Sequence, residues 1–106
     1  MDNKYIYQPC PVSKTLQLVN GKWKILILYR LSFQDIRYNE LKRQVYGITN
    51  TVLTRALTEL QQDGFIQREE FDETPPRVIY SITAYGKTFL PILHEIKKWS
   101  ETYMKD

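Results

Sequence analysis

One segment, residues 49–64, constrains the fold of this chain more strongly than any other part of the sequence. Thr49 is a residue type that caps helix starts and Gly64 is a type that ends helices, so a helix is predicted between them. With about 100° of rotation per residue, one face of this helix is apolar and consists of Leu53, Ala56, Leu57 and Leu60. The opposite face has no carboxylate at its centre and carries Thr51, Thr54, Arg55, Thr58 and Gln62. The pattern indicates a helix that packs on a core through one side and offers the other side to a polar partner.

Turn-forming residues place a second helix before this segment and a β-hairpin after it. Asn39 is expected to cap a short helix over residues 40–45, and Gly47 allows the positive φ of a tight turn. Two β-rich runs follow at residues 65–71 and 78–82, and the proline-containing stretch between them predicts a hairpin loop. This order of elements is typical of a winged helix-turn-helix, whose second helix lies in the major groove of DNA.

The remaining elements are predicted to be helical. Residues 12–19 and about 22–31 form two helices, and the second is apolar around most of its circumference, which predicts a central, buried helix. Thr83 is expected to cap a last helix that reaches about residue 103, with Pro91 kinking or splitting it. The predicted fold class is α+β and mostly α, a winged helix-turn-helix with N- and C-terminal dimerisation helices. Its expected limits are a single domain over 1–106, the helix-turn-helix at about 39–63, the wing at about 65–82 and the C-terminal dimerisation helix at about 84–103.

The distribution of charge favours an anionic partner. The formal net charge is +3, and residues 1–48 hold eight basic side chains against three acidic ones. The sequence shows no targeting segment and no long apolar run, and its single cysteine cannot form an internal disulfide. A cytoplasmic protein without membrane contact is therefore expected.

The polar face of the helix over residues 49–64 is chemically suited to double-stranded DNA. Arginine can donate two hydrogen bonds to guanine, and threonine can bond a base edge or place its methyl group against thymine. The candidates for base readout are Asn50, Thr51, Thr54, Arg55 and Thr58. The candidates for phosphate or wing contacts are Lys22, Lys24, Arg37, Lys42, Arg43, Thr49 and Arg77. The hairpin also carries acidic side chains, which argue against deep insertion, so only a peripheral contact through Arg77 is expected.

Short motifs along almost the whole chain carry a family resemblance. In order, they are Cys10-Pro11-Val12, Gly21-Lys22-Trp23-Lys24, Arg37-Tyr38-Asn39-Glu40-Leu41, Gly47-Ile48-Thr49, Leu53-Thr54, Leu57-Thr58-Glu59-Leu60, Asp63-Gly64, Pro75-Pro76-Arg77-Val78 with Tyr80, and Thr83 with Gly86-Lys87. With these motifs the chain resembles the HxlR family of winged-helix regulators, which are relatives of the MarR group. Two departures are a loop over residues 32–36 without the glycine that is common there, and a recognition helix with a single arginine.

The resemblance implies a homodimer that binds a pseudo-palindromic operator, most simply as a repressor. Its interface would be built from the N-terminal segment and the last helix, and the last helix does carry an apolar stripe with a spacing of three or four residues. The candidate interface residues are Ile6, Tyr7, Phe89, Leu93, Ile96, Trp99 and Tyr103.

Cys10 is a candidate sensor. It precedes a helix N-terminus, where a thiolate is favoured, and the resemblance implies that some family members sense electrophiles or oxidants at this position. A small electrophile or oxidant is then the expected inducer. The alternative is an inert, structural cysteine that behaves as a small hydrophobe.

Two other classes of function stand beside DNA binding. An enzyme is disfavoured because the sequence offers no paired carboxylates, no metal-ligand spacing and no phosphate-binding glycine loop, so no catalytic residue, cofactor or metal is expected. The only histidine, His94, is expected at an interface or on the surface. The second alternative is a winged-helix module that binds another protein through its acidic wing, without DNA readout.

Overall fold

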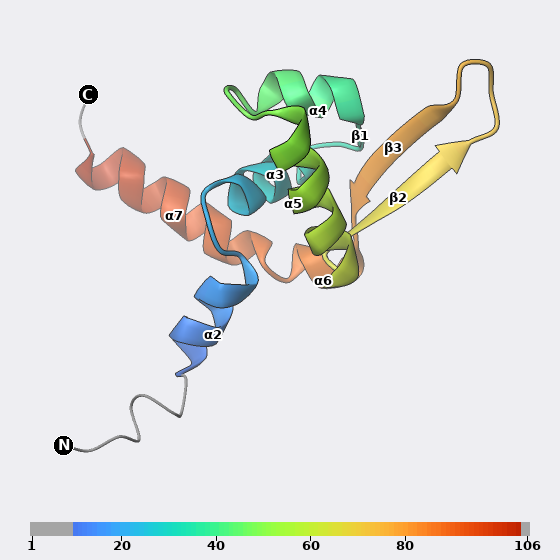
Figure 1. Cartoon of the computed structure of the whole chain (residues 1–106). Helices are drawn as coiled ribbons and strands as arrows, with labels where there is room; N and C mark the ends of the chain where they lie inside the picture. Colours follow the sequence, from blue (N-terminus) through green and yellow to red (C-terminus); the bar gives the residue numbers. More distant parts are fainter. Residues whose placement is uncertain (1–9, 105–106) are drawn as a thin grey trace.

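The structure, a computed structural model, describes residues 10–104 and contains two layers, a group of helices and a small sheet that projects from it (Figure 1). Its elements are α2 (Pro11–Leu18), α3 (Trp23–Leu31), β1 (Ile36–Arg37), α4 (Tyr38–Gln44), α5 (Asn50–Gln62), β2 (Ile66–Phe71), β3 (Arg77–Ile82), α6 (Ala84–Lys87) and α7 (Leu90–Tyr103). The predicted helices and the predicted hairpin are therefore present, with ends within a residue or two of those expected. No helix in the described part of the chain combines the length and apolarity needed to cross a membrane.

The sheet is antiparallel with strand order β1-β3-β2. Strands β2 and β3 form the long hairpin that extends away from the helices as the wing, and Arg68 lies opposite Tyr80 in its ladder. Strand β1 was not predicted. It contains two residues, too few for an alternating pattern to be visible in the sequence, and it exists because Ile36 pairs with Tyr80 at the base of the wing.

The core lies between α3, α5 and the base of the sheet. Its most deeply buried side chains are aliphatic and come from α3, α4, α5 and β2, namely Ile27, Leu28, Leu31, Leu41, Leu53, Leu57, Leu60 and Ile66. The four residues predicted for the apolar face of α5 are all buried. The prediction of a central, buried α3 is confirmed except at Leu26, which remains 43% exposed, because the other apolar residues of the helix are buried or pack against the core.

The caps of the helix-turn-helix agree only in part with expectation. The Thr49 hydroxyl accepts a hydrogen bond from the Val52 N–H at 3.2 Å, which confirms it as the cap of α5. Gly47 has φ +89°, as the tight turn requires. The Asn39 cap was wrong, because α4 begins at Tyr38 with Arg37 in the capping position, two residues earlier than predicted, and Asn39 lies exposed inside the first turn.

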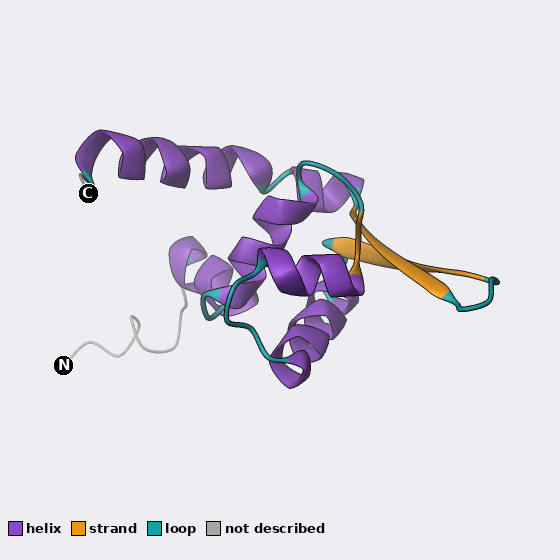
Figure 2. Cartoon of the chain, turned by 90° about the horizontal axis from the view of Figure 1, so that it is seen from above, coloured by secondary structure: helices purple, strands orange, loops and turns teal. Residues whose placement is uncertain are grey.

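The last helix is split, as Pro91 suggested. The short α6 ends at Lys87, and Pro91 occupies the first turn of α7, where its missing N–H is not needed. The break lets α7 run along one side of the molecule, with its C-terminal half projecting beyond the other helices (Figure 2). Its first half is anchored, since Phe89 and Leu93 reach the core.

Candidate DNA-binding surface

Helix α5 presents the polar face predicted for it. Asn50, Thr51, Thr54, Arg55 and Thr58 are all exposed, while the opposite side of the helix is buried against the core. The exposed face therefore carries one cation and several short hydrogen-bonding groups on a rigid helix. This is the size and chemistry that can enter a major groove.

A tyrosine of the preceding helix contacts this face. The hydroxyl of Tyr38 lies 3.0 Å from the Thr54 hydroxyl and donates toward the Asn50 carbonyl at 3.2 Å. One turn further on, the Thr58 hydroxyl donates to the Thr54 carbonyl at 2.8 Å. Tyr38 was missed as a site residue because nothing in its local sequence links it to a helix that begins twelve positions later.

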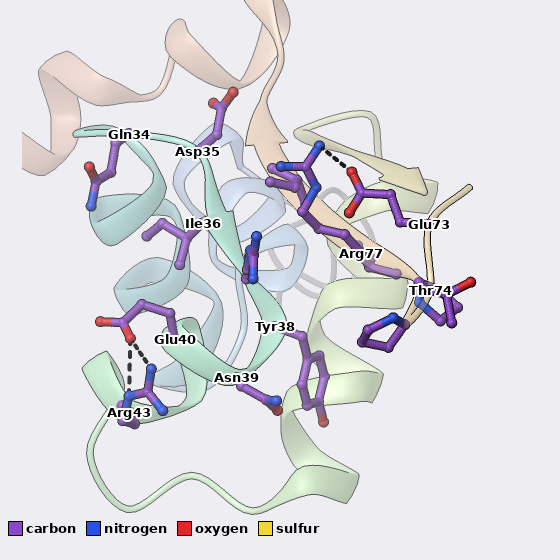
Figure 3. A pocket seen from close by; sticks show the side chains of 15 residues that line it. Gln34, Asp35, Ile36, Tyr38, Asn39, Glu40, Arg43, Glu73, Thr74 and Arg77 are labelled. Carbon is purple, nitrogen blue, oxygen red and sulfur yellow. Dashed lines mark hydrogen bonds and ion pairs between the residues drawn. The ribbon is translucent and has the colours of Figure 1, made fainter. Parts of the chain in front are cut away.

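A polar cavity of about 940 Å³ lies beside the recognition helix, between α4, β1 and the start of β3 (Figure 3). Three of the predicted phosphate ligands, Arg37, Arg43 and Arg77, line this cavity. Three carboxylates, those of Asp35, Glu40 and Glu73, accompany them. The cavity has a mixed charge rather than a purely basic lining.

The Glu40 and Glu73 carboxylates are each paired with an arginine. Arg43 donates to Glu40 through Nε at 3.0 Å, and Arg77 Nη2 lies 3.1 Å from Glu73 Oε1. The hydrogen bond from Arg43, followed by one from Gln44, lowers the pKa of Glu40. Both pairs lie near the surface, where such pairs contribute little stability, so a phosphate could compete for the arginines.

The Arg77 side chain is held in place by contacts within the wing. Its guanidinium carbon lies 4.2 Å from the centre of the Phe71 ring, across the hairpin. Its buried Nε has no hydrogen-bond partner among residues 10–104. The side chain therefore braces the two strands of the wing at the point where the loop begins.

Lys24 corrects the prediction for the phosphate ligands. Its side chain is buried, and its Nζ lies 2.7 Å from Glu59 Oε1 on α5. The hydrogen bond from Lys24 lowers the pKa of Glu59. Because the ammonium group is used inside the protein, Lys24 is not available to DNA.

The other predicted phosphate ligands lie at the surface or near it. Arg37 and Thr49 are exposed, and Lys42 is half-buried in α4. Lys22 is exposed at the start of α3, with its Nζ 4.4 Å from the centre of the Trp23 ring.

The apolar stripe on the last helix divides into a core part and an exposed part. Phe89 and Leu93 are buried in the core of the same chain, so their assignment to a dimer interface was wrong. Ile96, Trp99 and Tyr103 remain 51%, 58% and 69% exposed. Ile92, which was not predicted, lies with these three residues along one shallow groove on α7.

Helix α2 is the second unpartnered apolar element. None of its residues is buried within the described chain, and Val12 and Leu16 are exposed. The predicted interface residues Ile6 and Tyr7 lie outside the described residues.

Cys10 is exposed and occupies the N-cap of α2. Its Sγ accepts a hydrogen bond from the Ser13 N–H at 3.3 Å. His94, the only histidine in the sequence, is exposed on α7. Within residues 10–104, no group of three histidine, cysteine, aspartate or glutamate residues is arranged to hold a metal ion.

Comparisons with known proteins identify the family of the chain. The family model described as HxlR-like helix-turn-helix matches residues 18–106. The chain belongs to the HxlR family. It is 41% identical to an HTH-type transcriptional regulator, YdeP of Bacillus subtilis, over 92% of this chain and 76% of the relative.

Solved structures extend the comparison to the fold of this HxlR protein. A transcriptional regulator of the MarR family from Porphyromonas gingivalis W83 is 40% identical, with a TM-score of 0.86 over 92% of this chain and 95% of that one. The oxidised form of a redox regulator, HypR, is 39% identical, with a TM-score of 0.85 over 92% of this chain and all of that one. The resemblance drawn from the sequence is confirmed, and the chain is a helix-turn-helix transcriptional regulator.

Proposed function

We propose that this HxlR protein is a sequence-specific repressor that binds a pseudo-palindromic operator as a homodimer. The observation that carries the proposal is the exposed face of α5, where Arg55 and three threonines are presented without a carboxylate at the centre. A solvated helix face of ordinary composition mixes lysine and glutamate. A face of threonine, asparagine and arginine instead matches the donors and acceptors of base edges.

The DNA backbone would lie over the basic residues around α5. Arg37, Arg43 and Arg77 line the cavity between α4 and the wing, next to the base-reading face. A phosphate that enters this cavity would take over the hydrogen bonds that Arg43 gives to Glu40. Lys22, Lys42 and Thr49 would add contacts at the edge of the same surface. Because Arg77 braces the wing, its contact with DNA is expected to be peripheral.

A second copy of the chain would cover the exposed apolar residues of α2 and α7. The groove on α7 is lined by Ile92, Ile96, Trp99 and Tyr103, and a soluble protein rarely leaves such a continuous patch exposed. A two-fold dimer would place its recognition helices in successive major grooves, about 34 Å apart. Such a regulator would work in the cytoplasm, on double-stranded DNA.

Cys10 would act as a thiol switch in this dimer. The thiol is exposed at the N-terminus of α2, where its Sγ accepts a hydrogen bond from the Ser13 N–H, so an oxidant can reach it. The relative HypR is described as a redox regulator in an oxidised form. With diamide as oxidant, two Cys10 thiols would lose two protons and two electrons to the N=N bond, forming one intersubunit disulfide and one hydrazine.

The first test is DNA binding measured by fluorescence anisotropy at two salt concentrations. The labelled duplex is the DNA directly upstream of the gene, and unlabelled nonspecific DNA is the competitor. Tight binding that weakens with salt and survives the competitor supports the proposal. The variant Arg55→Ala should lose operator binding, whereas Lys87→Ala, which removes an exposed cation from α6 at the far end of α5, should not.

The second test adds diamide to the same assay. Loss of binding that dithiothreitol restores, and that is absent in Cys10→Ser, supports the switch. If diamide leaves operator binding unchanged, Cys10 has a structural role only. The acidic wing favours one alternative, a protein-binding module, and this would be adopted if no duplex binds even at low salt.

A further inference from the structure

The Tyr38 hydroxyl joins α4 to the two side chains that begin the base-reading face. It lies 3.2 Å from the Asn50 carbonyl, 3.4 Å from Asn50 Oδ1 and 3.0 Å from Thr54 Oγ1. The Tyr38 side chain is half-buried, whereas Asn50 and Thr54 are exposed. A single phenolic group is thus in contact with two of the five residues predicted to read bases.

The hydrogen bond between Tyr38 and Thr54 can run in either direction, and the contacts of Tyr38 with Asn50 favour one of the two. Both Asn50 oxygens can only accept, so the one Tyr38 proton has to point at Asn50 if these contacts are to be bonds. The Thr54 hydroxyl is then the group that donates to Tyr38. With this arrangement Tyr38 both donates to Asn50 and accepts from Thr54, whereas donation from Tyr38 to Thr54 would use only one of these contacts.

In this arrangement Thr54 faces DNA as an acceptor only. The Thr58 hydroxyl is also limited to accepting hydrogen bonds from DNA, because it donates its own proton to the Thr54 carbonyl at 2.8 Å. Two hydroxyl groups on successive turns of α5 thus offer lone pairs and no proton to a base edge.

We propose that Tyr38 is a specificity-determining positioning residue, which orients Thr54 to read an exocyclic amino group of adenine or cytosine. In the major groove adenine N6 and cytosine N4 are donors, whereas guanine O6 and thymine O4 are acceptors. An acceptor at a fixed place on one strand therefore distinguishes adenine from guanine, or cytosine from thymine. This inference rests on the proposed function, because it concerns how the same helix face selects DNA.

The experiment is selection of duplexes from a random library, followed by sequencing, with wild type and three variants. Thr54→Val keeps the shape of the side chain and removes its hydroxyl, so it identifies the base pair that Thr54 contacts. Tyr38→Phe keeps the ring and removes the positioning hydroxyl. Tyr85→Phe removes a hydroxyl from an exposed ring that stacks on Phe65 and serves as the matched control.

At the base pair identified by Thr54→Val, wild type should prefer adenine over guanine, or cytosine over thymine, by about three- to tenfold, as expected for one neutral hydrogen bond. Tyr38→Phe should reduce the preference at that position toward unity, because Thr54 can then rotate and donate. Preferences at the other positions should stay as in wild type and in Tyr85→Phe.

Three results would overturn the inference. One is an unchanged preference in Tyr38→Phe, another is an equal loss at all positions, and the third is a wild-type preference for guanine or thymine at the Thr54 position. If wild type itself enriches no motif, the proposed function has failed as well. Adding Tyr38→Phe to Thr54→Val should not change the base preference at that position any further. A further loss of preference or of binding in this double variant would instead indicate that Tyr38→Phe disturbs the fold.

Discussion

At the scale of single residues, Lys24 and Glu59 show how a charge expected at the surface can belong to the interior. Lys24 belongs to α3 and Glu59 to the side of the recognition helix, so their ion pair connects the central helix to α5. The Lys24 side chain is 8% exposed, whereas that of Glu59 is 44% exposed. Loss of the ion pair would therefore leave a buried charge at Lys24, whereas Glu59 would remain in contact with water.

Removal of Glu59 is expected to destabilise the protein more than removal of Lys24. Glu59→Gln leaves a buried ammonium without its counter-charge, which is costly. Lys24→Met fills the same space without charge and leaves Glu59 in contact with water. Urea unfolding of both variants at pH 7 measures the order, and a greater loss in Lys24→Met would contradict this interpretation.

The same pair predicts a pH dependence. Lys24 lowers the pKa of Glu59 in the folded state, so the stability it contributes is present above the ordinary glutamate pKa and is lost as pH falls through the lowered value. The difference in unfolding free energy between wild type and Glu59→Gln should be full at pH 7 and shrink below about pH 4.3. Subtraction of the variant isolates Glu59 from Glu40, whose pKa is also lowered. A difference that stays constant down to about pH 3 would exclude this linkage.

Gly86 is a residue at which any side chain would collide with the backbone. A Cβ there would lie 2.7 Å from Ile82 Cγ1 and far too close to the Phe65 carbonyl oxygen. Gly86→Ala should therefore cost about 1–3 kcal/mol of stability, or more, as overpacking does. The neighbouring exposed Lys87→Ala should change stability by less than about 0.5 kcal/mol. Urea unfolding followed by tryptophan fluorescence measures both stabilities. If Gly86→Ala and Lys87→Ala were equally stable, α6 would have to be able to shift away from the Phe65 backbone.

At the scale of elements, the wing depends on contacts across its own hairpin. Phe71 ends β2, Arg77 begins β3, and the two side chains stack where the loop starts. The ion pair of Arg77 with Glu73 ties the loop to the same side chain. The wing is therefore held in shape before it meets any partner.

Arg77→Ala should loosen the wing without unfolding the helices. A cation–π contact at an exposed site contributes about 0.5–1 kcal/mol, so amide hydrogens of the loop over residues 72–76 should exchange about two- to fivefold faster. Arg77→Lys keeps the charge but loses the planar stacking, and its exchange should lie between those of wild type and Arg77→Ala. Unchanged exchange in Arg77→Ala would mean that the β-ladder alone holds the wing.

At the scale of the whole molecule, α7 serves both the core and the surface. Its first half contributes Leu93 to the core, and its second half carries exposed Trp99 and Tyr103, whose ring centres lie 5.5 Å apart. The two halves should therefore respond differently to substitution.

Trp99→Asp is expected to shift the protein from dimer to monomer while leaving the fold intact, because it places a charge in the proposed interface. Leu93→Ala should instead cost about 2–5 kcal/mol of stability through a core cavity. Sedimentation velocity measures the first effect and urea unfolding the second. A Trp99→Asp protein that remains dimeric would move the interface away from the α7 groove.

Much of the fold could be predicted from the sequence because it is encoded locally. The Thr49 cap, the 3.6-residue period of α5 and the glycine at the turn all act within a few residues, so the amino-acid pattern alone predicts the recognition helix and its two faces. Pro91 acts in the same local way to divide the last helix.

Contacts between distant segments decided the parts of the fold and of the candidate site that the sequence pattern did not predict. A helical stripe shows that Phe89, Leu93 and Trp99 share a face, but only the packing of α7 shows that the first two fill the core and the third remains exposed. The two-residue strand β1 exists only because β3 lies beside it. The sequence by itself therefore determined which elements form and which faces they have, because caps, turns and periodicity are local. Which groups meet, including Lys24 with Glu59 and Tyr38 with Thr54, was decided by the tertiary structure, because those partners are brought together only when the helices pack.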